Sequence, residues 1–243
     1  MRSLFLILAA CLPLLAADRI RVQIITGGHA HDLGFYSLFE GQPGLAVSIN
    51  PHPSAYRSDL RGKVDVLVLY DLHDLATDVQ KKNLQDYLES GGGLVVLHHA
   101  LADNWQWRWW YQDVVGGRFL MGAEGAAPGS TAKAPVRLSV RPVARHPVLD
   151  GVEAFTLDDE GYKGMWLSPK STPLLETASA ENDAVNDKVV AWIGPWPKSR
   201  VVAIQLGHGA GAYTSETYRR LVRNAIAWAA PAPTSRTAAS SRE

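Results

Sequence analysis

The sequence predicts an α/β fold, in which a mostly parallel sheet is covered by helices on both faces and extended by antiparallel strands. Apolar runs typical of strands, such as residues 21–26, 64–70 and 94–97, alternate with helical segments, as in parallel βαβ units. Residues 94–97 are four unbroken apolar side chains, which favours a central strand. Residues 134–141 alternate polar and apolar side chains, as an antiparallel edge strand does, so the sheet is expected to be mixed.

Two helices are predicted in the first part of the chain. Asp32 can cap a short helix over residues 33–39, because a carboxylate can accept hydrogen bonds from the free amides of the first turn. Thr77-Asp-Val-Gln80 has the form of a capping box, so a second helix is expected to begin there and to end at Gly91. Its inward face is predicted to contain Val79, Leu84, Tyr87 and Leu88.

The last part of the chain predicts a hairpin and a final helix. Residues 189–193 and 200–206 flank a turn with two prolines, which indicates two antiparallel strands. Residues 216–229 form an amphipathic helix whose apolar side is made of Tyr218, Leu221, Val222, Ala225 and Ile226.

Composition limits the classes of partner. The chain has 243 residues, 47% of them hydrophobic, and 24 basic residues balance 24 acidic ones. This length suits one large α/β domain. Without a basic patch, nothing favours binding to nucleic acid or to a membrane surface. A small neutral or weakly charged ligand is expected instead.

Both ends of the chain are expected to lie outside the folded domain. Residues 1–17 have a positive start, an apolar stretch and a small-residue end, which is typical of a secretory signal cleaved after Ala17. The alternative is a lipoprotein signal that is cut before Cys11. Cys11 is the only cysteine, so cleavage after Ala17 leaves no thiol for disulfides or catalysis. Residues 18–230 are then the domain, and residues 231–243, rich in Pro, Ser and Thr, are expected to be disordered.

Histidines follow the predicted strands. In an open parallel sheet the carboxyl ends of neighbouring strands border one crevice, where such folds bind ligands. Imidazole suits both metal ligation and proton transfer near neutral pH. We therefore expect a functional site built from residues scattered in the sequence, and the histidines at these strand ends are His29, His31, His73, His98, His99 and His208.

Several short motifs together resemble the ThuA-like (trehalose utilisation) family. They are Ile25-Thr-Gly-Gly-His29, Asp65-Val-Leu-Val-Leu-Tyr-Asp71, Gly91-Gly-Gly-Leu-Val-Val-Leu-His-His-Ala100, Val115-Gly-Gly-Arg-Phe119, His146-Pro-Val148, Asp159-Glu160 with Tyr162-Lys163, Gln205-Leu-Gly-His208 and Arg223-Asn-Ala-Ile-Ala-Trp228. The resemblance implies a flavodoxin-like three-layer sandwich, similar to the class I glutamine amidotransferases. It also implies a role in the uptake and breakdown of sugars, notably through 3-keto-glycosides.

The comparison with amidotransferases implies a different chemistry here. Those enzymes carry a cysteine on the tight turn after the central strand, and this sequence has His98-His99 there. Without a thiolate, glutaminase chemistry is excluded. The turn would instead hold an imidazole over the sheet edge. If both residues were extended they would face opposite sides, so only one of them need enter the site, and His98 is the one we expect there.

Two uses of the site residues are open. In the first, His98 takes a proton and Glu160 or Lys163, expected on a loop, polarises an oxygen. In the second, His98, His208 and His29 bind zinc or another divalent metal. The residues expected to bind substrate are His29, Asp71, His99, Trp105, Trp107 and Tyr162, the tryptophans because flat aromatic faces suit pyranose rings. Core packing is the alternative for both tryptophans. His52 and His146, which precede prolines, are interpreted as turn residues.

The function predicted from these features is that of an exported protein acting on a sugar or an oxidised sugar. A concrete mechanism removes the acidic C–H beside a ketone and stabilises the enolate, giving isomerisation or elimination of a glycosidic bond. The alternative is a non-catalytic carbohydrate-binding protein on the same scaffold.

Overall fold

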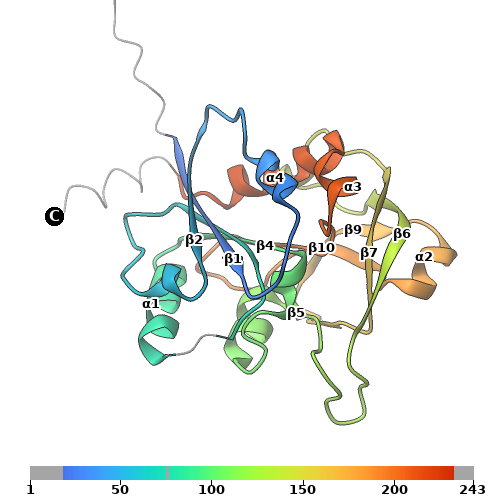
Figure 1. Cartoon of the computed structure of the whole chain (residues 1–243), viewed down its shortest axis with the longest axis horizontal. Coiled ribbons are helices and arrows are strands. Elements are labelled where there is room, and N and C mark those ends of the chain that lie inside the picture. The colour runs from blue at the N-terminus through green and yellow to red at the C-terminus, as the bar shows by residue number, and fades with distance from the viewer. Residues whose placement is uncertain (1–18, 75–76, 233–243) are drawn as a thin grey trace, which may run out of the picture.

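The computed structural model describes residues 19–74 and 77–232 and contains a nine-stranded mixed sheet (Figure 1). Half of the sheet is parallel, and its strands follow the order β2, β1, β3, β4, β11. This is the order of flavodoxin-like folds, which bind ligands beside the carboxyl ends of the first and third strands. The strands are β1 (Ile20–Gly27), β2 (Leu45–Pro51), β3 (Val66–Asp71), β4 (Gly93–Leu97) and β11 (Val201–Ile204).

The other half of the sheet is antiparallel, which confirms the predicted mixed architecture. It continues from β11 through β10 (Val189–Ile193), β9 (Thr172–Thr177), β6 (Thr131–Pro142) and β7 (Phe155–Lys163). The expected hairpin is the antiparallel pair β10 and β11. The expectation of an edge strand at residues 134–141 is wrong, because β6 pairs with β9 on one side and with β7 on the other.

The edge strand β7 was expected to be a loop. Its sequence contains three acidic residues and a glycine, a composition disfavoured in strands. Pairing with the long strand β6 overrides that preference. Outside the large sheet, β5 (Gly117–Arg118) pairs with β8 (Trp166–Leu167).

The helices begin near the predicted residues. Thr77 accepts a hydrogen bond from the Gln80 amide and donates its own amide to the Gln80 side chain, so the predicted capping box starts α1 (Asp78–Glu89). Val79, however, is 64% exposed, and Gln80 takes its place on the buried face. The other helices are η1 (Leu33–Leu38), η2 (Ser54–Tyr56), η3 (His98–Ala102), η4 (Trp110–Val115), η5 (Pro147–Leu149), α2 (Ala180–Val185), α3 (Ala210–Tyr213) and α4 (Glu216–Ala229).

Two hydrophobic cores, one on each face of the sheet, make the fold a three-layer sandwich. Alternate residues of β4 divide between them: Val95 and Leu97 face the core under α4 and η1, whereas Leu94 and Val96 face the core under α1 and η4. In Figure 1, α4 and α1 lie on opposite sides of β4. Burial on both faces explains the unbroken apolar run of this strand.

The described residues contain no helix long and apolar enough to cross a membrane. The predicted signal segment, Cys11 and most of the predicted tail lie outside the described residues.

Helix α4 offers a direct test of the core. The side chain of Leu221 is fully buried under the sheet, so Leu221→Ala should lower the free energy of unfolding by about 2–5 kcal/mol. Exposed Arg223 on the same helix is the matched control, and Arg223→Ala should change it by less than about 0.5 kcal/mol. Urea denaturation measures both values. Equal effects of the two substitutions would contradict this packing.

Candidate functional site

His98 follows the central strand β4 on a strained turn. Its backbone has φ 47°, in the left-handed region, where residues other than glycine are uncommon. The side chain has no exposed surface. A strained backbone of this kind persists only where the surrounding structure holds it, and it is most common at functional sites. The turn therefore presents an imidazole at the carboxyl edge of the sheet, in the position that the resemblance implied.

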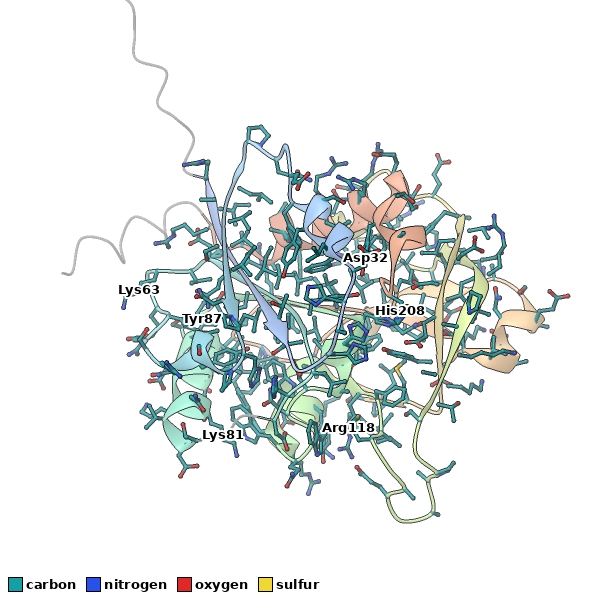
Figure 2. All side chains as sticks on the ribbon, viewed as in Figure 1. Asp32, Lys63, Lys81, Tyr87, Arg118 and His208 are labelled. Carbon is teal, nitrogen blue, oxygen red and sulfur yellow. The ribbon has the colours of Figure 1, made fainter. Side chains whose placement is uncertain are left out.

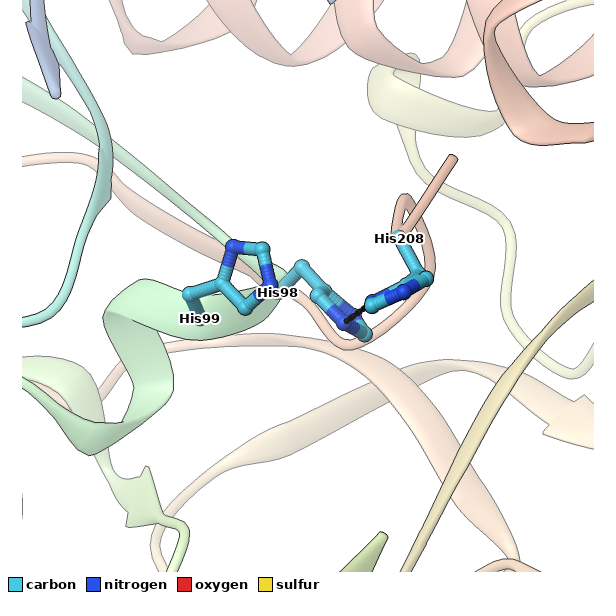
Figure 3. A group of neighbouring side chains, drawn as sticks. All are labelled: His98, His99 and His208. Carbon is cyan, nitrogen blue, oxygen red and sulfur yellow. Dashed lines mark hydrogen bonds between the residues drawn. The ribbon is translucent and has the colours of Figure 1, made fainter. Parts of the chain in front are cut away.

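Four groups meet the His98 ring. The carbonyl oxygen of Gln205 lies 2.6 Å from Nδ1, and a carbonyl can only accept, so Nδ1 carries the hydrogen. The other ring nitrogen, Nε2, faces the Tyr162 hydroxyl at 2.9 Å, Oε2 of Glu160 at 3.2 Å and Nδ1 of His208 at 3.2 Å. As a neutral ring His98 accepts the Tyr162 hydroxyl there, and as an imidazolium it donates to Glu160. Figure 3 shows His98 and His208 facing each other. We call His98, His99, His208, Glu160 and Tyr162 the His98 cluster.

Strand β7 brings Glu160 and Tyr162 to this cluster. Residues two apart in a strand share a face, and both of these side chains contact His98. The Gln205 side chain donates a hydrogen bond to the Glu160 carbonyl at 2.8 Å, which ties β7 to the end of β11. Figure 2 shows His208 between the parallel strands and the β6–β7 pair. The antiparallel edge strand β7 thus contacts the residues that follow the parallel strands β4 and β11.

Asp159 and Gly207 position His208. Both carboxylate oxygens of buried Asp159 accept backbone hydrogen bonds at 2.8 Å, from Gly207 and from His208. Gly207 has φ +123°, and a Cβ there would lie 2.2 Å from the Tyr218 hydroxyl, so only glycine fits this turn. Sequence analysis missed the roles of Asp159 and Gln205, although both belong to the motifs quoted above.

His99 also belongs to the cluster, although only one residue of the pair would need to enter the site if both were extended. The two residues lie in a 3₁₀ turn, not in an extended strand, and their ring centroids are 4.5 Å apart. His99 stacks on exposed His29 with centroids 4.1 Å apart. Neither ring nitrogen of His99 has a hydrogen-bond partner. Burial, followed by the nearby imidazoles, lowers the pKa of His99 to about 2, so its ring is neutral.

The charges around His98 favour an ionised carboxylate beside a neutral phenol. Burial alone would raise the pKa of Glu160, but the hydrogen bond with His98 and the charges of His98 and His208 lower it below its usual value. Burial and the Glu160 charge raise the pKa of Tyr162 well above its usual range. Tyr162 therefore keeps its proton and acts as a hydrogen-bond donor. The cluster meets solvent through His208, whose side chain is 38% exposed.

Asp71 does not reach a position where it could bind substrate. It has no exposed surface and bonds Nδ1 of His52, a residue interpreted from the sequence as part of a turn. Burial, and then Asp71, raise the pKa of neighbouring Asp103 well above its usual value. Asp103 also accepts the His73 amide at 2.7 Å. This network joins the ends of β2 and β3 to the segment after η3 and is closed to solvent.

Lys163 lies on the opposite face of β7 from Tyr162, so the structure does not bring it to the His98 cluster. Its Nζ donates to the carbonyl oxygens of Asp183 at 2.7 Å and Asn186 at 3.2 Å, and its side chain is 45% exposed. The prediction of a catalytic Lys163 assumed a loop. The alternation of side chains along a strand turns it away.

The two tryptophans predicted to bind sugar differ in their surroundings. Trp107 packs on Trp109 with ring centroids 4.8 Å apart and stacks with Trp110, so it belongs to the core side of this segment. Trp105 is half-buried, and its carbonyl accepts a hydrogen bond from Arg118. Among the described residues, neither indole has a ring contact with the His98 cluster.

Potential metal ligands gather at two places in the described part of the chain. One is His98, His99 and His208, and the other is the buried set His52, Asp71 and Asp103. His29, predicted as a ligand, stacks on His99 and belongs to neither group. Only the first group has a partly exposed member, His208, and a catalytic metal needs an open position.

The strand order and the strained residue after β4 define an α/β protein of the class I glutamine amidotransferase-like fold. A putative GMP synthase protein from Thermoplasma acidophilum has this fold: it is 14% identical, with TM-score 0.53, and the alignment covers 86% of this chain and 94% of that one. The family model of ThuA, described as trehalose utilisation, matches residues 35–229. The chain belongs to the ThuA family.

Two similar solved structures are themselves described as putative ThuA-like proteins. That from Parabacteroides merdae has TM-score 0.75 at 17% identity, covering 87% of this chain and 90% of that one. That from Bacteroides uniformis has TM-score 0.67 at 21% identity, covering 88% and 92%. These likenesses concern the fold. A comparison with curated protein sequences finds no match.

The neutral, buried His99 predicts a loss of stability in acid. Its pKa is about 2 in the folded chain against an ordinary 6.5, so the unfolded chain binds more protons between these values. The free energy of unfolding should therefore fall as pH drops below about 6.5, with His99 adding up to about 1.4 kcal/mol per pH unit. Urea denaturation in EDTA from pH 7 to pH 4.5 should give a shallower dependence for His99→Gln. An unchanged slope would contradict burial of a neutral imidazole.

Proposed function

We propose that this chain is an exported enzyme of sugar utilisation that isomerises a keto-sugar, such as a 3-keto-glycoside, or eliminates its glycosidic bond. Membership of the trehalose-utilisation family supports a sugar-related role. The observation that carries the proposal is the convergence of Glu160, Tyr162 and His208 on Nε2 of His98. Proton acceptors and a neutral hydrogen-bond donor then stand within one small volume.

The proposed reaction starts at the C–H bond beside the ketone. A base takes this proton, and the electron pair moves into a C=C bond as the ketone oxygen becomes an enolate. In isomerisation the enolate oxygen takes a proton, the hydroxyl on the deprotonated carbon gives up its proton to become the new ketone, and a proton adds to the former ketone carbon. In elimination the ketone forms again, the C–O bond on the next carbon breaks, and the leaving sugar oxygen takes a proton.

This chemistry needs a proton acceptor and a group that stabilises the enolate oxygen. The lone pair of His98 Nε2 and the Glu160 carboxylate, 3.2 Å apart, are the acceptors available in the cluster. A positioned general base typically contributes about 10²- to 10⁴-fold in rate. The Tyr162 hydroxyl can donate a hydrogen bond to the developing oxyanion.

The substrate is proposed to bind over His29 and His99, at the carboxyl ends of β1 and β4. Stacked imidazoles at this edge fit the ligand position of the fold. Trp105 remains a proposed sugar platform, because its half-buried indole follows the same turn. Asp71 and Lys163 take no part in this arrangement.

Hydrogen exchange tests the enzymatic proposal. With a 3-keto-glucoside in deuterated water, the wild-type protein should exchange the hydrogen beside the ketone. His98→Ala should lower this rate by about 10²- to 10⁴-fold, while substrate affinity stays largely unchanged. NMR follows the exchange, and calorimetry gives the affinity.

Lys163→Ala is the matched control for that experiment, because it removes a charged side chain from the opposite face of β7. It should exchange at the wild-type rate. If the wild-type protein binds keto-sugars or glucosides without exchange or product, with or without added zinc, the chain is a carbohydrate-binding protein and the enzymatic proposal fails.

Export makes a separate prediction. The apolar, arginine-led start and the small residues before Asp18 should direct secretion, followed by cleavage after Ala17. Mass spectrometry of protein from the native host should find a mature chain beginning at Asp18. A lipid on Cys11 would indicate the lipoprotein route, and an intact Met1 on protein retained in the cytoplasm would contradict export.

A further inference from the structure

We propose that His98, His208 and Glu160 bind one divalent cation of the zinc type. The ligand atoms are Nε2 of His98, Nδ1 of His208 and Oε2 of Glu160. This assignment rests on the cluster of the proposed function, but it makes Nε2 of His98 and Oε2 of Glu160 metal ligands in place of the free proton acceptors of the metal-free alternative. Metal binding is measured without substrate, however, so either proposal can fail alone.

The spacing of the three atoms matches one face of a coordination tetrahedron. His98 Nε2 lies 3.2 Å from Glu160 Oε2 and 3.2 Å from His208 Nδ1, and the remaining side of the triangle is 3.3 Å. A tetrahedron with metal–ligand bonds of about 2.0–2.1 Å has edges of about 3.3–3.4 Å. A single cation above this triangle can therefore bond all three atoms with little movement.

Three atoms that can each offer a lone pair face one another in this triangle. The hydrogen on Nδ1 of His98 meets the Gln205 carbonyl, so in the neutral ring Nε2 offers a lone pair. Glu160 is likewise an acceptor. The Tyr162 hydroxyl and a hydrogen on His208 Nδ1 are the donors that His98 Nε2 meets in the cluster, and a cation would satisfy the three ligand atoms at once.

Neighbouring groups hold each ligand in place, as the surroundings of metal sites commonly do. The Gln205 carbonyl fixes the tautomer and the ring of His98. The Gln205 side chain holds the backbone of Glu160, and Asp159 holds the backbone of His208. The ligands come from the turn after β4, from β7 and from the segment after β11, so the fold itself brings them together.

A fourth position remains for water or a substrate oxygen. His98 is fully buried, but the Glu160 and His208 side chains are 17% and 38% exposed. His99 can contact a ligand there, because one of its nitrogens lies within 4.8 Å of ligand atoms of His98 and His208 and neither nitrogen has a partner. Two histidines, one glutamate and an open position are a ligand set of catalytic zinc sites.

Metal titration of the full chain tests the site. Protein stripped with EDTA should bind one equivalent of Zn²⁺, measured by competition with a chromogenic chelator, and Co²⁺ should give the visible absorption of a tetrahedral centre. Glu160→Gln and His208→Ala should each weaken Zn²⁺ binding by at least about 10- to 100-fold, the loss that even removal of an outer-shell partner causes. Circular dichroism verifies folding of each variant.

His146→Ala is the control for adventitious binding to histidine, because His146 caps η5 and packs on Trp228 away from the cluster. It should bind Zn²⁺ as the wild type does. The proposal is overturned if wild-type protein binds no stoichiometric Zn²⁺, or if folded Glu160→Gln keeps wild-type affinity. Loss of affinity in His99→Ala but not in Glu160→Gln would also overturn it, in favour of a three-histidine site.

A last comparison separates the two proposals. Hydrogen exchange on the keto-sugar is measured with stripped and with Zn²⁺-loaded protein. Stoichiometric metal binding without exchange in either form supports the metal site and rejects the enzymatic function. Exchange that is equal in both forms supports the enzyme, and the titration then decides the metal site by itself.

Discussion

The hydrogen bond between His98 Nδ1 and the Gln205 carbonyl is the constraint on which the rest of the site depends. It joins the ends of two neighbouring parallel strands, β4 and β11, and it directs Nε2 toward Glu160 and Tyr162 of β7. The left-handed backbone of His98 makes this orientation possible. Gln205 then uses its side chain to hold Glu160. One residue after β11 thus sets the tautomer of the histidine and the place of the carboxylate.

Local patterns in the sequence predicted the parallel half of the fold well. The unbroken apolar run of β4, the capping box of α1 and the apolar side of α4 all depend on nearby residues. The placement of β7 does not, because that strand lies next to β6 in the sheet while its Glu160 contacts the turn after β4. Sequence reasoning identified Glu160 and Tyr162 through family motifs. It assigned Lys163 a role because the alternation of a strand was not recognised.

Burial explains why two sets of similar residues at one sheet edge differ in whether they can bind a ligand. Like the His98 cluster, His52, Asp71 and Asp103 are potential metal ligands, and they also follow strands or turns at that edge. They are closed to solvent, where burial, and then Asp71, raise the pKa of Asp103 well above its usual value. That set stabilises the junction of strand ends. The His98 cluster keeps partly exposed members, so a ligand can reach it. Strand position was visible in the sequence, but solvent access was not.

The His98 cluster also lowers the stability of the fold in two ways that packing does not compensate. A non-glycine residue in the left-handed region costs on the order of 1–3 kcal/mol, and the unpartnered nitrogens of buried His99 cost about 1–3 kcal/mol when hydration is lost. Apolar residues after β4 would avoid the second cost. A chain retains such a destabilised arrangement where a ligand satisfies the unmatched atoms or where chemistry requires them. The three converging atoms of His98, His208 and Glu160 provide a place for both, since a bound cation would compensate the lone pairs and could polarise a substrate oxygen.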